Sequence, residues 1–184
     1  MKRKLFAIVF VILIGSPLFV FGSNLNEIRM EFYQITIDSK NTPQLLEKLY
    51  AIDNPNAVIL AYTAATEAIM AKVAWNPYSK FNYLFKSKET FEKAIQQNDK
   101  NIEIRFLRFS VEHHIPKYLG MSKNLQQDKQ VILNELDNNS LMTMNEEMLN
   151  YTMRFLINSN QCSNEELSRI RKVLSDKQLT SKPD

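Results

Sequence analysis

The sequence predicts an all-α fold of about eight helices arranged in antiparallel hairpins. Helix-start residues recur along the chain at points where polar stretches interrupt an apolar pattern of helical period. Only one glycine, Gly120, lies beyond residue 22, whereas tight β-hairpin turns depend on glycine. No stretch of useful length alternates apolar and polar residues as a half-buried strand does. We expect the hairpins to stack either as a short solenoid or as an irregular bundle.

Residues 1–22 have the pattern of a secretory signal peptide. The basic residues Lys2–Lys4 are followed by the apolar run Leu5–Ile14, which has the length of a signal-peptide core. Val20 and Gly22 supply small or branched residues at the −3 and −1 positions of a cleavage site. We therefore expect cleavage after Gly22 and a periplasmic or extracellular protein with a single α-helical domain at residues 23–184.

An uncleaved membrane anchor is the alternative interpretation of the same segment. Leu5–Phe21 is interrupted by Gly15–Pro17 and lies at the short limit for crossing about 30 Å of hydrocarbon. Any membrane contact is expected only through this segment, if it is retained. The only cysteine, Cys162, is far from the cleavage point, so a lipoprotein anchor and an intramolecular disulfide are both excluded.

The first helices are predicted from capping residues. Asn24 with Glu27 is typical of a capping box and predicts a helix that ends at about Ile37. Thr42–Pro43 predicts an N-cap followed by a proline at the first helical position, with a helix over residues 44–52.

The same combination of an N-cap residue and a following proline recurs at Asn54–Pro55 and Asn76–Pro77. It predicts two longer helices, at about residues 56–75 and 78–97. Asn101 opens a further helix that ends near Pro116.

The last three helices are predicted by three further capping boxes. These pair Asn124 with Gln127, Thr143 with Glu146 and Ser163 with Glu166. Gly120 lies in the tight connection before the first of these helices, and we predict a left-handed backbone there.

A stripe of alanines marks the helix over residues 56–75. Its members recur at spacings of three and four and are Ala57, Ala61, Ala64, Ala65, Ala68, Ala71 and Ala74. Small side chains let a neighbouring helix approach closely, so the stripe predicts interior packing.

The sequence also contains a weak internal repeat with a spacing of 45 residues. Leu46–Leu49, followed by Asn56, reappears as Phe91–Ala94, followed by Asn101. The second copy resembles a tetratricopeptide repeat between about Phe91 and Phe106, although the usual turn proline is replaced and the Leu-Gly pair of the first helix is absent. This resemblance implies a helical-hairpin scaffold that binds a protein or peptide.

Glu112, His113 and His114 are the strongest candidates for acid–base chemistry, because they include the only two histidines. Adjacent helical residues point about 100° apart, so the two imidazoles do not chelate one ion from a regular helix. His113 continues an apolar stripe through Phe106, and His114 continues a second stripe through Leu107. Packing near a helix end is therefore the main interpretation, and a catalytic or metal role is the alternative.

Cys162 is considered as a nucleophile because a helix N-terminus lowers a thiol pKa. It precedes Ser163, however, where it is expected to pack against Leu167, and two acidic residues follow at Glu165 and Glu166. We expect a structural role.

Aromatic residues are interspersed with basic residues between Lys72 and Arg108. Proteins that bind single-stranded nucleic acid use this combination, because bases stack on the aromatic rings and the basic side chains contact the phosphates. Without residues 1–22 the chain has 20 basic and 20 acidic side chains, so nucleic-acid binding is not expected. Most of these aromatic residues recur at the helical spacing that is typical of buried positions. Trp75, Tyr78 and Tyr83 are the candidates for lining a binding groove.

These features together favour a non-enzymatic binding or scaffold protein with a protein or peptide partner. One remaining glycine is too few for a phosphate-cradling loop, and we expect no cofactor and no metal. Two alternatives stay open: an enzyme with an acid–base site at Glu112, His113 and His114, and a carrier of an apolar ligand between helices.

Overall fold

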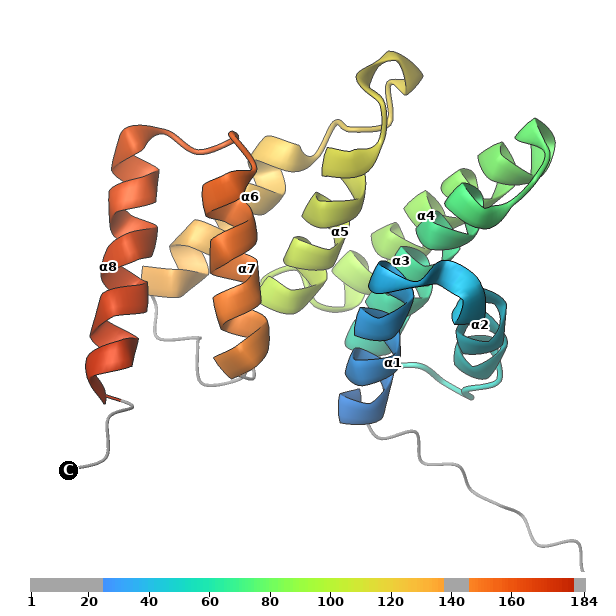
Figure 1. Cartoon of the computed structure of the whole chain (residues 1–184), viewed down its shortest axis with the longest axis horizontal. Coiled ribbons are helices and arrows are strands. Elements are labelled where there is room, and N and C mark those ends of the chain that lie inside the picture. The colour runs from blue at the N-terminus through green and yellow to red at the C-terminus, as the bar shows by residue number, and fades with distance from the viewer. Residues whose placement is uncertain (1–24, 138–145, 181–184) are drawn as a thin grey trace, which may run out of the picture.

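The computed structural model describes residues 25–137 and 146–180, which fold into eight α-helices and two short 3-10 turns without any strand (Figure 1). The predicted all-α class is therefore confirmed. The helices are α1 (Leu25–Ile37), α2 (Thr42–Tyr50), α3 (Ala57–Val73), α4 (Pro77–Gln97), α5 (Ile102–His114), α6 (Leu125–Asp137), α7 (Glu146–Asn158) and α8 (Asn164–Thr180). The 3-10 turns are η1 (Ser39–Asn41) and η2 (Lys117–Leu119).

Asparagine side chains start the three central helices. The Oδ1 atom of Asn56 accepts hydrogen bonds from two backbone N–H groups of the first turn of α3, each 3.0 Å long. Asn76 caps α4 through the N–H of Ser79, and Asn101 caps α5 through the N–H of Ile104. These bonds satisfy donors that a helix leaves unpaired at its start. The predicted Asn76–Pro77 and Asn101 starts are confirmed.

Two predicted helix starts are wrong by one or two residues. Asn54 adopts a left-handed backbone with a φ of 49°, and Asn56 caps α3 in its place. Thr42 lies inside α2, because η1 precedes it and its hydroxyl donates to the carbonyl of Ser39. The chain offers two candidate caps at each place, Asn54 and Asn56 before α3 and Asn41 and Thr42 before α2, and the N-cap positions are Asn56 and Asn41.

Of the predicted capping boxes, the one between Ser163 and Glu166 forms as expected, with reciprocal bonds of 2.8 and 3.2 Å. The predicted capping box between Asn124 and Gln127 is wrong. The N–H of Asn124 donates instead to the carboxylate of Glu112, at 2.7 Å. Asn24, Thr143 and the predicted signal peptide lie outside the described residues.

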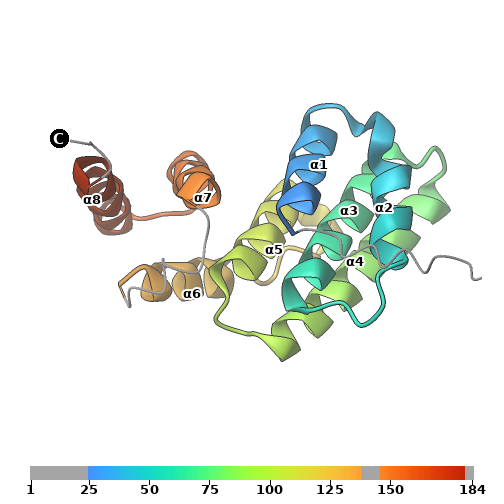
Figure 2. The same ribbon diagram turned by 90° about the horizontal axis from the view of Figure 1, so that it is seen from below.

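Helix α5 lies between α1–α4 on one side and α6–α8 on the other, as Figure 2 shows, and it contributes residues to two hydrophobic cores. Ile104 and Leu107 face the first core, which is built by α1 to α4. Phe106 and Phe109 face the second core, which is built by α6, α7 and α8. The two apolar stripes of α5 therefore serve two different cores. Met148 of α7 packs against both.

Helices α3 and α4 pack along each other as an antiparallel pair in Figure 1. Close approach is possible because most alanines of the predicted stripe are buried, Ala61, Ala64 and Ala65 completely. The predicted interior packing of this stripe is confirmed for these residues. Tyr62 is also fully buried in α3 and meets the ring of Phe32 edge to face, with the ring centroids 5.2 Å apart.

Buried ion pairs join α5 to α6. The carboxylate of Asp128 is fully buried and accepts hydrogen bonds from Arg105 and Arg108, at 2.6 to 2.9 Å. Burial of three charges requires this degree of pairing, since an unpaired charge in the interior is costly. Lys129 continues the connection by pairing with Glu166 of α8.

Gly120 follows η2 and has a φ of 63°, so the predicted left-handed backbone is confirmed. No helix within residues 25–137 or 146–180 is both long and apolar enough to cross a membrane.

Candidate binding groove

The described residues form a groove with a volume of about 1200 Å³. Its walls come from α1, α3, α4, α5 and α7, together with η2. Helices α1 and α7 are far apart in the sequence but begin at the same end of the molecule, as Figure 1 shows, and the groove lies between them. We refer to this hollow as the α1–α7 groove.

The wall formed by α3 contains small side chains. Ala65, Ala68 and Ala71 of the alanine stripe line the groove, and Ala65 and Ala71 are buried. Leu107 and Val111 of α5 continue the apolar lining. Alanine fills little volume, so the edge of the stripe that is not covered by α4 leaves a hollow instead of a packed contact.

Large apolar side chains remain exposed along the rim of the α1–α7 groove. These come from three helices and η2: Met30 (65% exposed), Tyr33 (53%), Phe81 (45%), Tyr118 (86%) and Tyr151 (46%). Single exposed apolar residues are ordinary, but a gathering of them around one hollow is typical of an interaction site.

A polar network closes the wall of the groove at the first turns of α1. Arg29 donates two hydrogen bonds to the buried carboxylate of Glu103, at 2.6 and 2.7 Å. The hydroxyl of Tyr62 donates to the same carboxylate at 2.7 Å. The bond to Glu103 raises the pKa of Arg29, and burial raises the pKa of Tyr62. The Arg29 charge is therefore neutralised within the protein.

Two lysines at the opposite end of the groove have no such partner. Lys72 lies in the last turn of α3 and Lys80 in the first turn of α4, and both are exposed and line the groove. Within the described residues neither forms an ion pair at 4 Å or less. The remaining charged lining residue, Glu147, lies in the first turn of α7. The lysine end of the groove is therefore electropositive.

The three residues predicted as acid–base candidates do not line one shared hollow, although the rings of His113 and His114 meet edge to face with their centroids 5.4 Å apart. Glu112 is buried, and its carboxylate is occupied by the backbone and side-chain N–H groups of Asn124, at 2.7 and 2.6 Å. Burial raises the pKa of Glu112, although the bonds to Asn124 oppose the shift. This carboxylate fixes the start of α6, which is a structural function.

The two histidines continue the stripes of α5, as predicted. The ring of His113 stacks on Phe109, with the centroids 6.2 Å apart, and meets Phe155 edge to face. Burial there lowers the pKa of His113, with further contributions from the charges of His114 and Lys117. His114 lines the α1–α7 groove, and its Nδ1 lies 2.7 Å from the carbonyl oxygen of Ser110.

Only His114 of the three therefore lies at the groove. Glu112 and His113 line a separate, smaller hollow of about 330 Å³ beside Gly120. Among the described residues, no three His, Cys, Asp or Glu side chains are arranged to hold a metal ion.

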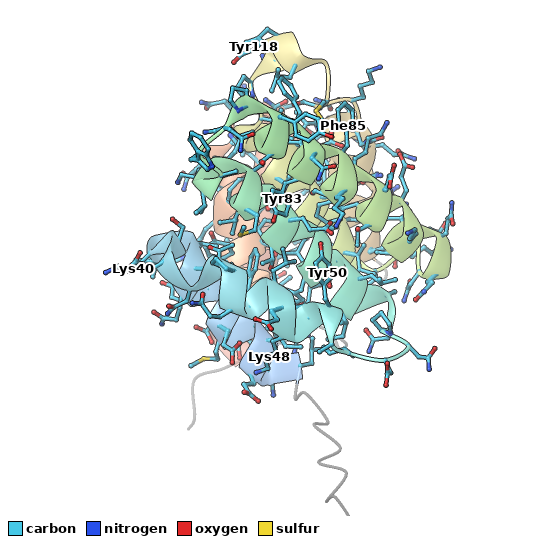
Figure 3. The ribbon with its side chains drawn as sticks, turned by 90° about the vertical axis from the view of Figure 1, so that its right-hand side faces the viewer. Lys40, Lys48, Tyr50, Tyr83, Phe85 and Tyr118 are labelled. Atoms are coloured by element: carbon cyan, nitrogen blue, oxygen red, sulfur yellow. The ribbon has the colours of Figure 1, made fainter. Side chains whose placement is uncertain are left out.

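The aromatic residues predicted to line a groove do not line this one. Trp75 and Tyr78 are almost fully exposed, at 90% and 83%, near the turn between α3 and α4. Tyr83 lies on the face formed by α2 and α4, on the same side as Tyr50, as Figure 3 shows. The α4 residues that line the α1–α7 groove are Pro77, Lys80, Phe81 and Leu84.

Cys162 is half-buried against the second core, and its thiol lies 3.6 Å from the carbonyl oxygen of Leu156. Burial raises the pKa of this thiol, which disfavours the thiolate that a nucleophile requires.

Sequence reasoning missed the contribution of α1 to the groove, although the sequence contains a signal. Ile28 and Ile35 form the buried stripe of α1, but Met30, Tyr33 and Ile37 form a second apolar stripe at helical spacing. A helix with two apolar stripes has one that the core does not need. The contribution of α7 brings residues more than a hundred positions away from α1 to the same hollow, which no local pattern predicts.

No protein-family model, curated protein or solved structure matches this chain significantly.

Proposed function

We propose that the protein is a non-enzymatic binding protein whose α1–α7 groove holds an apolar segment of a protein or peptide partner. The observation that carries this proposal is the groove itself, a hollow of about 1200 Å³ with an apolar lining and a rim of exposed aromatic and methionine side chains. Burying such a surface against a partner is favourable because apolar area is removed from water. The signal-like residues 1–22 support a site of action outside the cytoplasm.

The geometry gives less support to an acid–base enzyme. A general acid or base must lie within hydrogen-bond reach of a substrate in a shared pocket. Glu112 is bonded to Asn124, and only His114 of the predicted trio lines the large groove.

The apolar lining also supports a second candidate, a carrier of an apolar small molecule. This candidate and the peptide-binding candidate share the same groove, so both depend on the same rim residues. They differ in whether the rim residues contact a segment of a protein or an apolar small molecule.

Site-specific photo-crosslinking in the native host tests the location of binding. A benzophenone side chain in place of Tyr33, which lines the groove, is expected to give a discrete protein adduct on irradiation. The same group in place of Tyr78, which is exposed but outside the groove, serves as the matched control. An adduct at Tyr78 alone, or no protein adduct at Tyr33, would contradict the proposal.

A further inference from the structure

We propose that the occupant of the α1–α7 groove is an amphipathic helix of a partner protein with acidic residues at one end. This inference rests on the proposed function and specifies the chemistry of the partner. Three properties of the groove support it: its length, the free charge at one end and the exposure of its rim.

The length of the groove matches about three helical turns. Its lining runs along α1 from Asn26 to Thr36 and along α5 from Phe106 to Ile115. At about 1.5 Å per helical residue, each wall is about 15 Å long. A helix that lies parallel to these walls would place residues i, i+3 or i+4 and i+7 against the lining, which is the usual arrangement for a helix bound in a groove.

The end of the groove where α3 meets α4 is positively charged. Arg29 is bonded to Glu103, whereas Lys72 and Lys80 are exposed and have no ion-pair partner among the described residues. Acidic residues of an occupant would meet both lysines at the end where α3 meets α4. The negative end of the occupant's helix dipole would add to the attraction if its C-terminus lies there.

The rim favours a protein helix over a buried small molecule. Sites for small molecules usually have volumes of about 300–1000 Å³ and enclose most of the ligand. The α1–α7 groove is larger, and Met30, Tyr33 and Tyr118 on its rim are at least half exposed. A helix about 10 Å wide would cover these side chains, whereas a single acyl chain on the floor would leave them in water.

The test is a titration of the protein with two designed peptides by isothermal calorimetry. Both are helix-stabilised, about 14 residues long, and present Leu or Phe at positions i, i+4, i+7 and i+11. They differ only in the last turn, which has two Glu residues in one peptide and two Lys residues in the other. The acidic peptide is expected to bind about tenfold more tightly, because two ion pairs of ordinary surface strength replace two repulsions.

Two double variants test whether the preference for the acidic peptide depends on Lys72 and Lys80. The double variant Lys72→Glu/Lys80→Glu is expected to reverse the preference, with the basic peptide binding more tightly by about tenfold. The matched control Lys93→Glu/Lys100→Glu makes the same change of net charge at exposed positions outside the groove and is expected to keep the wild-type preference. Thermal unfolding verifies that both variants remain folded.

A groove variant distinguishes failure of this inference from failure of the proposed function. Met30→Asp is expected to abolish binding of both peptides. If both peptides bind equally and only Met30→Asp matters, the groove function stands and the acidic partner is wrong. If Met30→Asp has no effect on peptide binding, the proposed function is wrong as well.

Two further outcomes would overturn the inference. Saturable binding of oleate, with no binding of either peptide, would identify a carrier of an apolar anion. A concentration-dependent dimer that Met30→Asp abolishes, with no peptide binding, would identify a second copy of this chain as the occupant.

Discussion

Buried charged side chains of α5 and α6 each form several hydrogen bonds. Asp128 is fully buried between two guanidinium groups, and Arg105 also donates to the carbonyl of Asp99 at 2.7 Å. Glu112 is held in a similar way by Asn124. These residues determine how α6 is attached to α5.

Replacing Asp128 by Asn is expected to lower the free energy of unfolding by about 3–5 kcal/mol, because two guanidinium groups would remain buried without a counter-charge. Urea unfolding of the variant measures this loss. Glu92→Gln is the control, since the pair between Lys88 and Glu92 is exposed and 3.8 Å long. That substitution is expected to cost less than about 0.5 kcal/mol. Equal effects of the two substitutions would contradict a structural role for Asp128.

Gly120→Ala is expected to cost about 1 kcal/mol of unfolding free energy, because alanine disfavours the left-handed backbone at a φ of 63°. No atom lies within 4 Å of where the new Cβ would be, so the cost comes from the backbone alone. Gly120→Asn is expected to cost less, since asparagine tolerates this conformation better. A stabilised alanine variant in chemical denaturation would refute this account.

The histidine stack predicts a pH dependence. The folded-state pKa of His113 is lowered by burial against aromatic rings, so protonation favours the unfolded chain. The contribution of His113 to stability is therefore present above its ordinary pKa and is lost as the pH falls from that value through the lower folded-state pKa. We expect His113→Gln to reduce the loss of stability between about pH 7 and about pH 5. Thermal unfolding of both proteins across this range gives the comparison, and parallel profiles would contradict it.

At the scale of the helix, α5 determines the arrangement of the others. It is capped by Asn101, supplies apolar residues to both cores and holds Asp128 and Asn124 of the next segment. Any loss of order in α5 therefore affects both halves of the molecule.

Asn101→Ala is expected to lower the unfolding free energy by about 1 kcal/mol, which is the usual cost of losing an N-cap side chain. Asn98→Ala is the matched control, because Asn98 is exposed and uses only its backbone at the end of α4. Its effect is expected to stay within about 0.5 kcal/mol. Chemical denaturation of both variants measures the free energy of unfolding. An unchanged free energy of unfolding in Asn101→Ala would show that the side-chain cap does not stabilise α5.

Helices with strong local signals could be predicted from the sequence, and the groove could not. The starts of α4 and α5 follow from Asn76 and Asn101, because capping is a bond between residues two or three positions apart. The two stripes of α5 predicted two packed faces for the same reason. Prediction failed where two caps competed, as at Asn54 and Asn56, and where a partner came from another helix, as Glu112 does for Asn124.

For the whole molecule, the two cores meet at α5, and the α1–α7 groove lies where they meet. Helix α1 belongs to the first core and α7 to the second, with Met148 in contact with both. The groove therefore exists only when both cores are docked on α5. A partner that fills it would stabilise this arrangement, because it binds the folded state alone.

The location of binding is tested most directly by nuclear magnetic resonance of methionine methyl groups labelled with carbon-13. Met30 and Met148 line the groove, whereas Met153 is fully buried in the second core and Met121 lies outside the groove. On titration with the acidic peptide, we expect the Met30 and Met148 signals to shift and saturate together while those of Met153 and Met121 stay unchanged. Unchanged Met30 and Met148 signals at saturation, or shifts at Met121 alone, would contradict binding in the α1–α7 groove.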